Sequence, residues 1–187
     1  MSYDSTATKK RLLDAALDEF AERGLSGARV DRIAAAAAAN KQAIYAYFGC
    51  KDDLFRAVLL EHCDAMLDAV AFDPLDLPGF AGGLFDYFLA NPKIVRLTLW
   101  RQLELPGVRE HASVTTKVCA LSTASKLGTP EALELFGIVH GLAIAPFAVA
   151  CAPTTASDAA TRARLAASRR AVVVATAAVV ETMTKKA

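Results

Sequence analysis

The segment from Val30 to Phe55 constrains the fold most, because it contains three helical pieces in quick succession. The first is a short apolar helix that carries Ile33 and a run of alanines. Asn40 then provides an N-cap for a second helix, since its side-chain oxygen can accept a hydrogen bond from a free backbone N–H group. A third helix begins near Lys51. Two short helices joined by a tight turn, the second of them polar at its start, are typical of a helix-turn-helix unit.

Composition and periodicity indicate an all-α protein for the rest of the chain. Hydrophobic residues make up 54% of the 187 residues and charged residues 22%, so a sizeable core is expected and global disorder is not. Alanine, the best helix former, is abundant. No segment shows the alternating pattern of a β-strand bounded by turn residues. We expect about nine helices, at residues 9–24, 30–37, 41–47, 51–71, 80–90, 92–103, 108–126, 130–151 and 158–183.

The order of these helices predicts two domains. Residues 1–51 are expected to form a three-helix DNA-binding domain that contains the helix-turn-helix. Residues 52–187 are expected to form a larger helical domain. In the second domain, Thr129 and Pro130 form a strong start signal, as N-cap and first helical residue.

Charge, cysteine spacing and hydropathy give weaker indications. The formal net charge of +1 gives no strong sign of a nucleic-acid partner, so the argument depends on where individual charges lie. The four cysteines are widely spaced, which predicts a reduced, intracellular protein. The N-terminal residues lack a signal-peptide core, and the longest apolar runs are too short to cross a bilayer. We therefore expect a soluble cytoplasmic protein with no membrane partner.

The second helix of the helix-turn-helix unit carries residues suited to reading a DNA major groove. Lys41 can donate to guanine, Gln42 can bond both hydrogen-bonding groups of adenine, and Ala43 can contact a thymine methyl group. Tyr45 and Tyr47 can place their hydroxyl groups on phosphates. These five residues are the expected contacts of the recognition helix with double-stranded DNA.

Two flanking residues complete the expected DNA contacts. Lys51 lies at the start of the next helix, where its ammonium and free backbone N–H groups can hold one phosphate. Arg29 lies just before the first helix of the unit and can reach the DNA backbone.

Four of these expected contacts have a structural alternative. The two tyrosines could pack their helix onto its neighbours, and Lys41 and Gln42 could form a plain solvated face. The basic cluster at residues 9–11 could be solvated or could contact phosphate.

Residues along the first sixty positions match a known family pattern: Ala15, Ala16, Phe20, Gly24, Ile33, Ala34, Ala37, Ile44, Tyr45, Tyr47, Phe48, Lys51 and Leu54. By these residues the segment resembles the tetracycline-repressor (TetR) family of transcriptional regulators. Three positions differ from the family pattern: Ala38 replaces a glycine in the turn, Ala39 a bulky apolar residue, and Cys50 a serine. Alanine at position 38 predicts a left-handed backbone, which is uncommon without glycine.

The resemblance implies a transcriptional regulator that binds a near-palindromic operator as a homodimer. Most regulators of this family are repressors, so repression is the expected mode. It also implies that the last two long helices form the dimer interface. Two such helices from each subunit would form a four-helix bundle. On these helices, apolar and small residues recur at three- and four-residue steps. The expected interface residues are Leu133, Phe136, Gly137, Gly141, Ile144, Val172, Thr176 and Val179. The alternative is that these faces are buried within one chain.

The resemblance further implies that the middle helices enclose a pocket for an unknown small-molecule effector. Such pockets are mostly apolar with a few polar groups. The expected lining residues are His62, Met66, Phe85, Phe88, Trp100, Leu103 and His140. Each of these residues could instead be ordinary core or surface.

Nothing in the sequence indicates catalysis. We find no catalytic triad order, phosphate loop, paired buried carboxylates or metal-ligand spacing, so we expect neither an enzyme nor a cofactor or metal. Glu104 and Glu110 flank a turn and are expected to be solvated. Two alternatives to a DNA-binding regulator remain: a helical small-molecule-binding protein or enzyme, and a dimerisation module without sequence-specific DNA binding.

Overall fold

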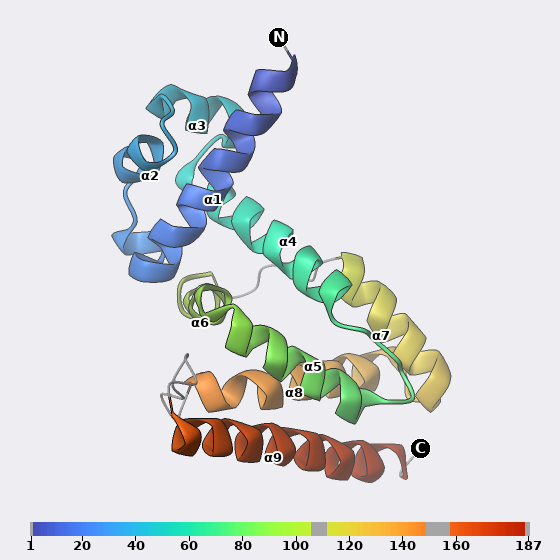
Figure 1. Cartoon of the computed structure of the whole chain (residues 1–187). Coiled ribbons are helices and arrows are strands. Elements are labelled where there is room, and N and C mark those ends of the chain that lie inside the picture. The colour runs from blue at the N-terminus through green and yellow to red at the C-terminus, as the bar shows by residue number, and fades with distance from the viewer. Residues whose placement is uncertain (1, 106–111, 149–157, 186–187) are drawn as a thin grey trace. The chain divides into compact units, whose positions relative to one another are not determined.

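The computed structural model describes residues 2–105, 112–148 and 158–185, and within these it contains nine α-helices and no strand (Figure 1). The all-α prediction is therefore confirmed. The helices are α1 (Ser2–Gly27), α2 (Val30–Ala36), α3 (Lys41–Phe48), α4 (Lys51–Ala69), α5 (Leu77–Ala90), α6 (Pro92–Glu104), α7 (Ala112–Ser125), α8 (Thr129–Ala148) and α9 (Ala159–Thr184).

Three helices begin earlier than the sequence predicted. Helix α1 already begins at Ser2. Helix α5 begins at Leu77, because the Asp76 carboxylate caps it by accepting a 2.9 Å hydrogen bond from the Gly79 N–H. Helix α8 begins at Thr129, one residue early, since the carbonyl of Gly128 already accepts from the Ala132 N–H. The expected helical residues 108–111 and 149–151, and Glu110 among them, lie outside the described residues.

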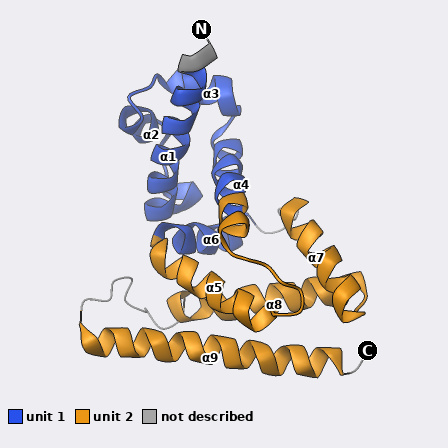
Figure 2. Ribbon diagram, turned by 45° about the vertical axis from the view of Figure 1, so that its right-hand side comes forward, with its two compact units in different colours: residues 1–63, 93–108 blue, residues 64–92, 109–187 orange. Residues whose placement is uncertain are grey.

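The chain divides into two compact units (Figure 2). Unit 1 comprises residues 1–63 and 93–108, and unit 2 comprises residues 64–92 and 109–187. Unit 1 thus contains α6 as well as the helix-turn-helix, whereas the sequence placed one boundary after residue 51. The division of function at that boundary stays a prediction.

Unit 1 has its own hydrophobic core. The rings of Phe20 and Phe55 meet edge to face with their centroids 4.9 Å apart, and neither side chain is exposed. Leu97 of α6 belongs to the same core. Because α1, α2, α3, α4 and α6 all contribute to it, the helix-turn-helix shares one core with the helices around it. The buried members are Leu12, Leu13, Ala16, Phe20, Leu25, Ala28, Ile33, Ala34, Ala37, Ile44, Leu54, Phe55, Val58 and Leu97.

Unit 2 is built around α5, which packs against α8 and α9, while α7 packs against α8. The inward face of α5 carries large apolar side chains, among them Phe80, Phe85 and Phe88, each at most 2% exposed. The Arg169 guanidinium of α9 binds the Asp86 carboxylate of α5 at 2.9 Å. Gly82 allows this approach, since a Cβ there would lie 2.9 Å from Arg169 Nη2.

Helix α8 is long and apolar enough, by length and composition alone, to cross a membrane, with a mean hydropathy of 1.4 over its most apolar window. A core helix of a soluble protein passes the same test. Here α8 contacts α5, α7 and α9, and Leu135, Val139 and Ala143 are fully buried. One side of α8 is therefore packed within unit 2.

Candidate nucleic-acid interface

The turn between α2 and α3 has the geometry of a helix-turn-helix. Asn40 caps α3, as predicted, because its Oδ1 accepts a 2.9 Å hydrogen bond from the Gln42 N–H. Ala38 has a φ of 48°, so the left-handed backbone expected at this position is confirmed. The Ala39 N–H closes the turn by donating to the Ala34 carbonyl at 2.9 Å. Ile44, fully buried, fixes α3 to the core of unit 1.

Replacing Ala38 with glycine is expected to stabilise the chain by up to about 1 kcal/mol, because an L-residue in the left-handed region is strained by about 1–2 kcal/mol and glycine loses about 0.5–1 in backbone entropy. Ala35→Gly, on exposed helical backbone of α2, is the control and should be destabilising. Urea unfolding of both variants measures the difference. Destabilisation by both substitutions to the same extent would show that the turn at Ala38 is not strained.

The surface of α3 displays most of the residues predicted to contact DNA. Lys41, Gln42, Tyr45 and Tyr47 are all exposed, the two tyrosines by 46% and 39% of their area. Ala43 is half-buried beside them. This arrangement leaves a cation, an amide and two phenol groups open to a large partner.

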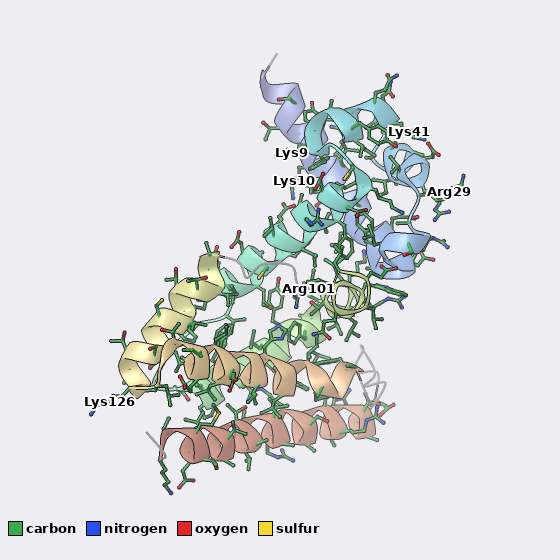
Figure 3. The ribbon with its side chains drawn as sticks, turned by 180° about the vertical axis from the view of Figure 1, so that it is seen from behind. Lys9, Lys10, Arg29, Lys41, Arg101 and Lys126 are labelled. Carbon is green, nitrogen blue, oxygen red and sulfur yellow. The ribbon has the colours of Figure 1, made fainter. Side chains whose placement is uncertain are left out.

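The two flanking cations lie at the same unit's surface. Arg29 is exposed, and Figure 3 shows it together with Lys41 at the edge that α2 and α3 form. Lys51 is half-buried, and its Nζ donates to the Ala28 carbonyl at 3.2 Å. Because an ammonium has three N–H donors, Lys51 can hold this carbonyl and a phosphate oxygen together.

One residue of this surface was missed by the sequence reasoning. Asp31, in the first turn of α2, forms an ion pair with Lys41 across the turn, with 2.8 Å between Oδ1 and Nζ. The hydrogen bond from Lys41 and the positive charge of Lys41 lower the pKa of Asp31. In turn, the hydrogen bond to Asp31 and the negative charge of Asp31 raise the pKa of Lys41. The sequence offered only the helix-start position of Asp31 as a signal, which is a common place for an acidic residue.

A second carboxylate, Glu19 of α1, organises the start of α2 and was also missed. Glu19 Oε1 accepts hydrogen bonds from the Arg29 N–H at 2.9 Å and from Arg32 Nε at 2.7 Å. Arg23 forms a further ion pair with it. Desolvation acts to raise the pKa of Glu19, but the Arg32 and Arg29 hydrogen bonds and the nearby charges outweigh it, so the net pKa is lowered.

Arg11 gives the basic cluster at residues 9–11 a partly structural role. Its Nε donates to the Ala37 carbonyl at 3.2 Å, which ties α1 to the C-terminal end of α2. Its Nη2 donates to the Thr8 hydroxyl. The sequence could not show the contact between Arg11 and Ala37, because these two residues are 26 positions apart.

Glu104 is not simply solvated, contrary to the sequence-based expectation. Its carboxylate accepts hydrogen bonds from the backbone N–H groups of Leu25 and Ser26, the second at 3.0 Å. These N–H groups follow Gly24, where α1 breaks with φ 67° and ψ −178°. Trp100 lies against the same glycine, since a Cβ there would be 2.8 Å from its Cε3 atom. Helix α6 therefore holds the break in α1.

The residues predicted to line an effector pocket fall into both units. In unit 2, the rings of Phe88 and His140 meet edge to face at 5.4 Å, with Phe85 and Met66 buried in the same unit. In unit 1, Leu103 is 73% exposed. His62, Trp100 and Leu103 belong to unit 1, and Met66, Phe85, Phe88 and His140 to unit 2.

The residues predicted to form a dimer interface divide between interior and surface. Gly137 and Gly141 are exposed on α8, with no atom within 4 Å of a Cβ built on either. The neighbouring Ile138 is 41% exposed, and Val174 of α9 is 68% exposed. Leu133 and Val179 are half-buried, whereas the chain itself buries the remaining four residues, which are Phe136, Ile144, Val172 and Thr176.

Two family models match the chain. Residues 12–58 match the model described as bacterial regulatory proteins, tetR family. Residues 76–178 match the model of a tetracyclin repressor-like C-terminal domain. The first match contains the helix-turn-helix, and the second covers more than half of the chain.

Individual proteins show the same likeness. The HTH-type transcriptional repressor SCO4008 of Streptomyces coelicolor is 48% identical over 101 residues, which are 54% of this chain and 53% of that protein. The repressor NicS of Pseudomonas putida is 33% identical over 123 residues, 62% of this chain and 56% of that protein. The chain thus spans about half the length of these curated relatives. The solved structure of SCO4942 from Streptomyces coelicolor is 38% identical with a TM-score of 0.69, covering 88% of this chain and 96% of that one.

Proposed function

The chain belongs to the TetR family of bacterial regulatory proteins, and we propose that it is a transcriptional repressor that binds a near-palindromic DNA operator as a homodimer. The observation that carries this proposal is the exposed face of α3. Lys41, Gln42, Tyr45 and Tyr47 are open to solvent, while Ile44 of the same helix is fully buried. A helix held in this way can enter the major groove without disturbing the core that supports it.

Sequence would be read by the first residues of α3 and the position on the duplex fixed by its neighbours. Lys41, Gln42 and Ala43 are the proposed base contacts, because their side chains suit guanine, adenine and the thymine methyl group. Tyr45, Tyr47, Arg29 and Lys51 are the proposed phosphate contacts, which hold the protein without reading sequence.

The proposed dimer uses the outer faces of α8 and α9. The exposed pair Gly137 and Gly141 lies one helical turn apart and allows a second helix to approach closely. Ile138 and Val174 supply exposed apolar area beside it. The buried Phe136, Ile144, Val172 and Thr176 would support this surface from inside the chain.

We also propose that a small molecule binds this protein and changes its affinity for the operator, and that the protein acts in the cytoplasm. Such a ligand can shift operator binding only if it binds the DNA-competent and the other conformation with different affinity. In unit 2, Phe88 and His140 offer an aromatic and a polar group in contact. A compound that raises the melting temperature but leaves operator affinity unchanged would contradict regulation by that compound.

Selection of bound duplexes from a random library with the purified chain tests the function. We expect an enriched inverted repeat whose half-sites lie about 34–36 Å apart, one helical turn, because a two-fold dimer presents two α3 helices. Two chains should bind each duplex. If no sequence is enriched and the affinity for DNA depends only on the salt concentration, the chain is better described as a dimerisation module or a small-molecule binder without sequence-specific DNA binding.

Two substitutions should affect operator binding in different ways. Lys51→Gln should weaken binding to all duplexes and reduce the slope of log K against log salt by about 1, because one phosphate contact is lost. Gln42→Ala should cost about 1–3 kcal/mol on the selected operator and much less on random DNA. Fluorescence anisotropy over a range of salt concentrations measures both.

Lys126→Gln, the same charge change at an exposed residue of unit 2, is the control for Lys51→Gln. Unchanged DNA affinity in both Lys51→Gln and Gln42→Ala would contradict the assignment of α3 as the reading helix.

A further inference from the structure

The ion pair between Asp31 and Lys41 places a carboxylate on the surface proposed to meet DNA. The pair connects the first turn of α2 with the first residue of α3, at 2.8 Å. Both side chains are about half exposed, 58% for Asp31 and 48% for Lys41. The charge of Arg29 also acts on both residues of the pair.

This pair is poorly explained as a device for stability. Exposed ion pairs contribute little to folding, because solvent and salt screen them and ordering two side chains is unfavourable. A negative charge on a DNA-binding surface also repels phosphates, which weakens the electrostatic part of DNA affinity. An acidic residue in the first turn of a helix does interact favourably with the helix dipole. The alternative explanation is therefore that Asp31 only stabilises the start of α2.

The consequences of the pair differ between random and operator DNA. On random DNA, Lys41 could gain only a phosphate contact, and moving to it would break the pair and leave Asp31 facing the phosphates. On an operator, Lys41 could stay near Asp31 and use another of its three N–H donors for a base acceptor in the groove. The carboxylate would therefore weaken binding to random DNA more than binding to the operator.

We propose that Asp31 is a specificity-determining residue that restrains Lys41 from phosphate contacts and reserves it for a base edge. This inference rests on the proposed DNA-binding function. Asp31 in this role discriminates by making the wrong complex worse, since specificity is a difference between two affinities.

Asp31→Asn is the direct test, because asparagine keeps the size and the polar end of the side chain while removing its charge. Affinity for random duplex should rise about fivefold at about 0.15 M salt, with the salt slope steeper by about 0.9, as Lys41 gains one phosphate. Affinity for the selected operator should change much less. The ratio of operator to random affinity should therefore fall several-fold.

Two further variants isolate the role of the pair. Asp68→Asn removes one negative charge from an exposed residue of α4 in unit 2, and it should leave the ratio unchanged. Lys41→Gln should lower operator affinity, and adding Asp31→Asn to it should then have no effect on the ratio, because the restrained group is absent.

The outcomes separate this inference from the proposed function. Equal gains on operator and random DNA would mean that Asp31 is a general repulsive charge, and uniform losses would mean that it only stabilises the start of α2; both overturn the proposal. Operator binding that Lys41→Gln leaves unchanged would overturn it while the repressor function stands. A wild-type chain that selects no operator would overturn both.

Discussion

Gly24→Ala is expected to lower the free energy of unfolding by about 2–5 kcal/mol, because alanine would be both strained and overpacked at this position. The backbone of Gly24 has φ 67° and ψ −178°, a conformation that essentially only glycine adopts. A Cβ atom there would lie 2.8 Å from Trp100 Cε3 and 2.9 Å from Glu104 Oε2. The aromatic ring belongs to α6 and cannot move away without disturbing the helix. Urea unfolding followed by circular dichroism measures the loss.

Gly27→Ala is the matched control in the same helix. Gly27 has no left-handed φ, and a Cβ there would meet only the Cβ of Arg23, at 3.3 Å. Its unfolding free energy should stay within about 1 kcal/mol of the wild type, because alanine is favoured over glycine in a helix. Trp100, the only tryptophan of the chain, reports on the environment of Gly24 by its fluorescence. If Gly24→Ala is as stable as Gly27→Ala, with unchanged fluorescence, α6 does not hold the break in α1.

The local features of the helix-turn-helix could be predicted from the sequence because each depends on neighbouring residues. The cap by Asn40 requires only the N–H group two residues later. The left-handed backbone at Ala38 was expected because alanine stands there in place of the glycine of the family pattern. Periodicity and capping act over a few residues, which is the range that a sequence pattern can show.

The remaining parts of the site depend on contacts between residues far apart in the chain. Glu104 accepts a hydrogen bond from the N–H group of Leu25, which lies 79 residues away in the chain. Its position beside a turn therefore predicted only a solvated side chain. The pairing of Asp31 with Lys41 depends on how α2 and α3 cross, which the pattern of either helix alone does not determine.

Helix α8 shows a different limit. Apolar residues occupy most of its surface, so spacing did not distinguish the buried Phe136 and Ile144 from the exposed Ile138. A helix that is apolar on all sides has no strong moment to indicate which face turns inward. Only the packing of α8 against α5, α7 and α9 separates its inner residues from those that stay exposed.

Glu19→Gln is expected to destabilise the chain at neutral pH by about 1–3 kcal/mol, because it removes the charged acceptor of several hydrogen bonds. The Glu19 side chain is only 10% exposed and binds Arg32 together with the backbone N–H of Arg29. Glu22→Gln, in the same helix, is the control, since the Glu22 side chain is 65% exposed and should cost little. Thermal and urea unfolding of the two variants give the comparison.

The effect of Glu19→Gln should depend on pH with a defined sign. The folded-state pKa of Glu19 lies below its ordinary value of 4.5, since hydrogen bonds and charges outweigh desolvation. Its stabilising contribution is therefore fully present above pH 4.5 and is lost as the pH falls through the lower, folded-state pKa. The stability difference between wild type and Glu19→Gln should shrink in that acid range. A difference that stays constant with pH would mean that the side chain acts by packing and not by charge.

Glu19 also connects stability to DNA binding. The carboxylate holds Arg29, a proposed phosphate contact, and Arg32 of α2, so it fixes the start of the helix that supports α3. Phosphate contacts position a protein on DNA without reading sequence, so misplacing Arg29 should weaken operator and random duplexes by similar factors. Asp31→Asn is expected to change the ratio of these affinities, whereas Glu19→Gln should lower both and leave the ratio unchanged. This contrast distinguishes Glu19, which is expected to stabilise the helix-turn-helix, from Asp31, which is proposed to determine its sequence specificity.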